Sequence, residues 1–140
     1  MDEEQKRAAL LGKIHTRKAH DDKWARTDFI LAQLFVWLAI LSSFLTAILA
    51  VADVVPKLVL ALLAAIPGAV ILVDKSFSFA RRARWHWDMV AKLDQFSNQL
   101  QFEEARVEDV SKQLGEFRFD MEAKFPAMSV EGLGDKPAQK

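Results

Sequence analysis

Two apolar runs constrain this chain more than any other feature: residues 29–52 and residues 58–73, with only five residues between them. The first run has 24 residues without a charge, and a helix rising about 1.5 Å per residue would carry it across the roughly 30 Å hydrocarbon layer of a bilayer. The second run has 16 uncharged residues, a length that also fits a buried core helix. Because the short link makes an antiparallel return the simplest path, and Lys57 can extend toward the interface, we expect a transmembrane hairpin.

The cations beside these runs predict how the hairpin is oriented. The net charge is zero, so the distribution of charge carries the information. Cytoplasmic flanks are enriched in Lys and Arg, and the link holds only Lys57. The cations on the opposite side are Lys23, Arg26, Lys75, Arg81, Arg82 and Arg84. Both termini are therefore expected to be cytoplasmic. Residues 50–52 resemble a signal-peptidase site, but the charged leader of 28 residues and the second apolar run disfavour a cleaved signal peptide.

Residues 1–28 are expected to form a cytoplasmic helix, because they are rich in strong helix formers and begin with acids. The apolar stripe of this helix is thin and consists of Leu10, Leu11 and Ile14. Such a helix could lie on the bilayer or pack on the helix that follows the second span. We favour packing, because Asp21 and Asp22 on its polar face would gain little from anionic lipid.

Residues 74–125 carry a regular apolar spacing that alternates steps of four and three, which is typical of a coiled coil or helix bundle. The positions are Met89, Leu93, Phe96, Leu100, Val107, Val110, Leu114, Phe117 and Met121, with one defect at Glu103. We expect an amphipathic helix with an oligomer seam. It either projects as one stalk or breaks near Glu103 or Gly115 and folds back. Residues 126–140 are expected to be a disordered tail.

Small and polar residues lie within the two runs. Ala61, Ala64, Ala65 and Gly68 have the spacing that lets membrane helices approach closely, so we expect them to pack against another helix. Gln33, Ser42 and Thr46 are candidates to line a water path through an oligomer. Neither run contains an ionisable residue, which argues against a proton relay or an ion-coupled transporter.

The segment 75–87 combines cations with aromatic residues and has no acid. A positive flank with an aromatic belt explains this composition, and binding of anionic lipid extends the same interpretation. Arg81, Arg82, Arg84 and Trp85 are the candidate contacts for an anionic lipid or ligand.

Catalytic motifs are absent: the sequence has no nucleophile elbow, P-loop, HExxH or glycine-rich nucleotide fingerprint. Cysteine is also absent, and His15 and His20 fall on different helix faces, so a metal site is disfavoured. We expect a protein that is not an enzyme, with no cofactor, no metal and no nucleic-acid partner.

The order of elements resembles the bacterial SLATT family (SMODS and SLOG associating two-transmembrane effectors). The resemblance covers residues 5–125 and is greatest within 75–104, at Arg84-Trp85-His86, Lys92-Leu93, Gln99-Leu100 and Glu103-Glu104. It implies an inner-membrane, pore-forming effector of an anti-phage or conflict system, which permeabilises the membrane after an upstream, nucleotide-linked signal. The family supplies no catalytic residues.

Combining these features, we expect an all-α membrane protein that forms homo-oligomers, contacts membrane lipids and responds to a separate sensor or regulator. The alternative is a membrane-anchored interaction scaffold without pore activity. A third class is a lipid or nucleotide sensor that uses Arg81, Arg82 and Arg84.

Overall fold

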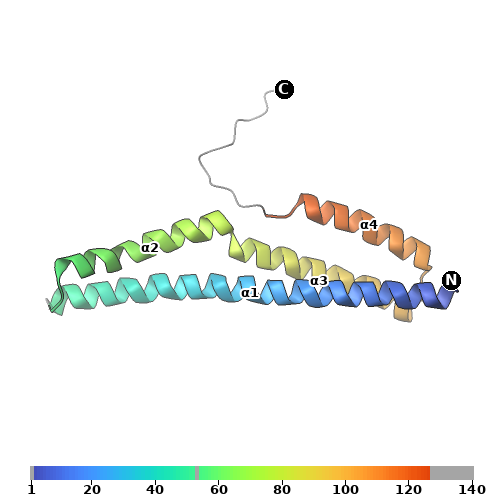
Figure 1. The fold of residues 1–140 in the computed structure, drawn as a ribbon, viewed down its shortest axis with the longest axis horizontal. Coiled ribbons are helices and arrows are strands. Elements are labelled where there is room, and N and C mark those ends of the chain that lie inside the picture. Colours follow the sequence, from blue (N-terminus) through green and yellow to red (C-terminus); the bar gives the residue numbers. More distant parts are fainter. Residues whose placement is uncertain (1, 53, 127–140) are drawn as a thin grey trace, which may run out of the picture. The chain divides into compact units, whose positions relative to one another are not determined.

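A computed structural model describes residues 2–52 and 54–126, and within these ranges the chain is helical without strands (Figure 1). The elements are α1 (Glu3–Ala52), α2 (Lys57–Phe77), α3 (Phe79–Phe102) and α4 (Val107–Ala123). The expected all-α class is confirmed. The helices divide between two compact units. We call residues 2–28 with 80–126 the three-helix unit, and residues 29–52 with 54–79 the apolar unit. Of the expected tail at 126–140, residues 127–140 lie outside the described residues.

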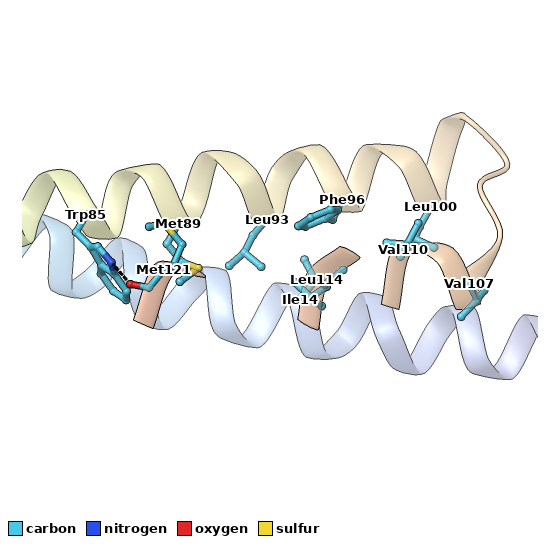
Figure 2. Packing of buried hydrophobic residues seen from close by; sticks show 10 residues of the cluster. All are labelled: Ile14, Trp85, Met89, Leu93, Phe96, Leu100, Val107, Val110, Leu114 and Met121. Carbon is cyan, nitrogen blue, oxygen red and sulfur yellow. Dashed lines mark hydrogen bonds between the residues drawn. The ribbon is translucent and has the colours of Figure 1, made fainter. Parts of the chain in front are cut away.

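The three-helix unit consists of the N-terminal half of α1, most of α3, and α4, packed around one apolar cluster (Figure 2). Ile14 on α1 is 1% exposed and belongs to the same cluster as Leu93 on α3 and Leu114 on α4. Leu10 and Leu11 pack against its edge. The expectation that the N-terminal helix packs on the helix after the second run is therefore confirmed.

The long amphipathic segment forms two helices, because the chain turns between Phe102 and Val107. Glu104 adopts a left-handed conformation with φ 51°, and the Ala105 N–H donates to the Gln99 carbonyl at 3.2 Å. This pattern terminates helices by satisfying carbonyls that have no partner within the helix. The Arg7 guanidinium also donates to the Leu100 carbonyl, at 3.1 Å. Of the two arrangements left open by the sequence, the structure has the fold-back.

The single stalk over 74–125 is therefore not formed. The segment is also interrupted at its start, where Ser78 caps α2 with φ 52° and its N–H donates to the Asp74 carbonyl at 2.7 Å. Gly115, the other candidate break, lies inside a continuous α4. Of the two candidate breaks, the chain turns at the one near Glu103. The apolar spacing fails there, and the turn leaves Glu103 and Glu104 exposed to water.

In the apolar unit, α2 lies alongside the C-terminal half of α1 (Figure 1). Ser42 and Val70 are buried, and the rings of Phe35 and Phe79 stack with centroids 5.5 Å apart. Only 6% of the most apolar window of each of the two long helical stretches is buried. A core helix of a water-soluble protein would be mostly covered. Two helices are thus long and apolar enough to cross a membrane, as expected.

Candidate functional site

The three candidate pore-lining residues do not share one face of α1. Ser42 is buried and its hydroxyl donates to the Ala39 carbonyl at 3.1 Å, while Thr46 donates to the Ser42 carbonyl at 2.7 Å. Gln33 is exposed. It precedes Ser42 by nine residues, which at about 100° per residue places it on the opposite side of the helix. Ser42 therefore faces into the apolar unit, whereas Gln33 faces away from it.

The candidate packing residues of α2 also lie on an outer face. Ala61, Ala64, Ala65 and Gly68 are all exposed, although we expected such residues where helices meet. Val70, the buried residue of α2, follows Ala61 by nine residues and so lies about 180° around the helix from it. The face with small residues is thus opposite the line along which α2 is buried.

The expected oligomer seam is the core of the three-helix unit. Leu93 and Leu100 on α3 and Val110 on α4 are at most 2% exposed, and they share one cluster within a single chain. Phe117 packs against this cluster and meets Phe96 edge-on at 5.9 Å between ring centroids. The remaining seam positions, Met89, Val107, Leu114 and Met121, are buried in the same cluster. The spacing is explained by packing within the chain, so it carries no argument for an oligomer.

A buried charged group lies beside this core. The carboxylate of Asp21 on α1 is fully buried. One of its oxygens accepts from Arg17 Nε at 2.9 Å, and the other lies 3.1 Å from Nδ1 of the buried His86 on α3. Two partners compensate the loss of hydration that burial imposes on a carboxylate. The placement of Asp21 on the polar face of the N-terminal helix was therefore wrong.

A second buried carboxylate belongs to Asp28, which is 2% exposed. Its Oδ2 lies 3.3 Å from Arg82 Nε on α3, a distance that makes an ion pair although the atoms are not aligned as a hydrogen bond. Polar side chains of α1 and α3 thus face each other at two levels, Asp21 with the His86 ring and Asp28 with Arg82. Each pair joins residues of two different helices and so links α1 to α3.

The four candidate contacts for an anionic lipid or ligand are divided between surface and interior. Arg81 and Arg84 are exposed, but Arg82 is the partner of Asp28. Trp85 is 8% exposed, and its Nε1–H donates to the Met121 carbonyl at 2.7 Å, as Figure 2 shows. A continuous anion site built from all four side chains is therefore not present. Trp85 instead connects α3 to the end of α4.

The heptad spacing also extends to the buried polar side chains, although a pattern of apolar residues alone does not include them. The spacing of four and three continues from Met89 backward through His86 and Arg82. On α1, Asp21 and Asp28 follow Ile14 at seven and fourteen residues. Two heptad stripes that end in acids on one helix and in basic side chains on another indicate that these side chains meet between the helices.

Comparison of the chain with protein-family models, with curated proteins and with solved structures finds no match. The site is therefore interpreted from its own geometry.

Proposed function

We propose that this chain is an inner-membrane protein of bacteria in which α1 and α2 cross the bilayer as a hairpin, with both termini in the cytoplasm. In this proposal several copies assemble through the spans and permeabilise the membrane when a separate sensor or regulator signals. The excess of Lys and Arg on the side of the termini supports the orientation.

The observation that carries the assembly is the outer face of α2. Within the apolar unit this face has no helix against it, because α2 is buried along the opposite side, at Val70. In lipid, apolar surface alone gives helices little reason to associate, whereas small residues let two backbones approach and gain van der Waals contact. A second copy of α2 is the partner that matches this face.

The position of Gln33 supports the same proposal. Its amide is exposed on the side of α1 opposite Ser42, and a polar side chain facing lipid tails is costly. Contact with another copy, or with water enclosed by several copies, would satisfy the amide. Gln33 is thus the polar residue of the spans that we assign to the assembly surface.

A scaffold without pore activity remains the second candidate function, and one observation favours it. The apolar heptad positions of α3 and α4 are used within the three-helix unit, so these two helices offer no heptad seam through which copies would be held together. The hairpin would then be an anchor, and the outer face of α2 would pack against a different membrane protein.

The stoichiometry of the protein in nanodiscs, measured as native mass, tests the assembly. We expect several copies for the natural chain and a single copy for Gly68→Leu. A Cβ at Gly68 meets no atom within 4 Å in the chain, so this variant changes the outer face of α2 without disturbing the contact with α1. Ala50→Leu, an exposed small-to-large change on α1 about 100° around the helix from Gln33, is the matched control and should leave the mass unchanged. A natural chain that is monomeric rules out a pore, because two spans cannot enclose one.

Release of a dye from liposomes tests permeabilisation. We expect release to rise more steeply than linearly with the number of copies per liposome. Release should be lost in Gly68→Leu but kept in Ala50→Leu. Oligomers that leave liposomes tight at every density would support the scaffold. In that case, replacing the hairpin with an unrelated one should preserve the cellular activity of the chain.

A further inference from the structure

A cavity of about 490 Å³ opens between α1, α3 and α4 in the three-helix unit. Its inner wall includes one buried apolar side chain from each helix, namely Ile14, Leu93 and Leu114. Figure 2 shows these three side chains directed toward one another between the helices. Cavities that bind small molecules have volumes of roughly 300–1,000 Å³ and mostly apolar walls, so this one is of a suitable size and lining.

Cations surround the apolar wall. The cavity is lined by Lys13 and Arg17 on α1 and by Arg118 on α4, and its described lining residues include no carboxylate. Arg17 pairs with Asp21 through Nε, and Arg118 pairs loosely with Glu122 at 3.6 Å. A guanidinium has five N–H donors, so both arginines keep donors for another acceptor. The opening is therefore suited to a negative group.

Gly12 keeps this opening accessible. It lines the cavity from the interior of α1, where glycine costs about 1 kcal/mol relative to alanine. A Cβ added at Gly12 would meet no heavy atom within 4 Å. Packing within the chain therefore does not require glycine at this position. Its effect is to leave open space next to Lys13 and Arg17, which a larger side chain would occupy.

We propose that this cavity is a binding site for a small anion with an apolar body, such as an aromatic carboxylate, sulfonate or phosphate monoester. The apolar body lies against Ile14, Leu93 and Leu114, and the anionic group accepts hydrogen bonds from Arg17 and Arg118. The proposal concerns the three-helix unit alone, so it holds or fails independently of whether the spans assemble.

Calorimetric titration of the full chain in phosphatidylcholine nanodiscs tests the site, with 2-naphthyl phosphate as the probe and empty nanodiscs as the blank. We expect saturable binding of one probe per chain that weakens as salt is raised. Inorganic phosphate lacks the apolar body and so loses the apolar burial, whereas 2-naphthol lacks the charge and so loses the charged hydrogen bonds. Each should therefore bind at least about tenfold more weakly than 2-naphthyl phosphate. Absence of binding, or equal binding of 2-naphthol, would overturn the proposal.

Two variants locate the binding. Gly12→Leu fills the opening and should weaken binding of the probe by more than about tenfold, and Arg118→Gln by about tenfold through the lost charged hydrogen bonds. Gly115→Leu is the matched control, since a Cβ there also meets no atom within 4 Å and Gly115 does not line the cavity. Unchanged affinity in both Gly12→Leu and Arg118→Gln would place the probe elsewhere and refute the assignment.

Nanodiscs that contain phosphatidylglycerol identify where the natural anion comes from. If lipid head groups occupy the site, affinity for 2-naphthyl phosphate should fall in these nanodiscs relative to phosphatidylcholine. Unchanged affinity assigns the site to a free, water-soluble anion.

Discussion

Phe96 lies in the centre of the three-helix unit and distinguishes a core within one chain from a contact between chains. Its side chain is 2% exposed and meets Phe117 of α4 edge-on, with ring centroids 5.9 Å apart. Phe102 lies on the same helix and is 76% exposed. Phe96→Ala and Phe102→Ala therefore remove the same atoms from one helix, at a buried and at an exposed position.

The expected effect of Phe96→Ala follows from its burial. Truncation of a buried phenylalanine costs about 3–5 kcal/mol through lost transfer free energy and the cavity left behind. A loss of that size is large compared with the roughly 5–15 kcal/mol that stabilise a typical domain. For Phe102→Ala we expect a change within about 0.5 kcal/mol, as for other exposed positions without special contacts.

Amide hydrogen exchange of the full chain in nanodiscs, followed by mass spectrometry, measures the difference. Protection of the slowest amides in α3 and α4 should fall between about a hundredfold and a few thousandfold in Phe96→Ala, because each 1.4 kcal/mol is about tenfold. The fall should not depend on protein concentration, since the contacts lie within one chain. Equal protection in the two variants, or a loss that reverses on concentrating the protein, would refute an intrachain core.

Two further predictions concern one ion pair and one glycine of this unit. Arg82→Met should lower the free energy of unfolding by about 3 kcal/mol in the same exchange experiment, because it leaves the buried Asp28 carboxylate uncompensated. Adding Asp28→Asn should recover most of that loss. A double variant no more stable than Arg82→Met alone would contradict the pairing. Gly115→Ala should raise the free energy of unfolding by up to about 1 kcal/mol, because the new methyl group meets no atom within 4 Å and alanine favours the helix; a decrease would show that the position needs glycine.

Patterns with a single physical cause could be predicted from the sequence. The runs at 29–52 and 58–73 predicted two long apolar helices, because their length and lack of charge leave few other structures. The heptad spacing from Met89 to Met121 predicted which apolar side chains pack against another helix. All of these side chains are buried except Phe117, which is half-buried. The defect at Glu103 indicated one of the two places where the helix might turn.

Only the tertiary structure decided which surfaces those side chains meet. A heptad stripe is satisfied equally by a second copy and by a neighbouring helix of the same chain, and the turn at Glu104 brings α4 within reach of α3. The same fold-back buries Trp85 and forms the cavity beside Gly12. The residues next to Trp85 and Gly12 in the sequence indicate neither result. Asp21 looked like a surface charge because burial depends on the partner helix, and its partner His86 lies more than fifty residues away in the chain. Local spacing determines which face of a helix is apolar, whereas the path of the chain determines what that face touches.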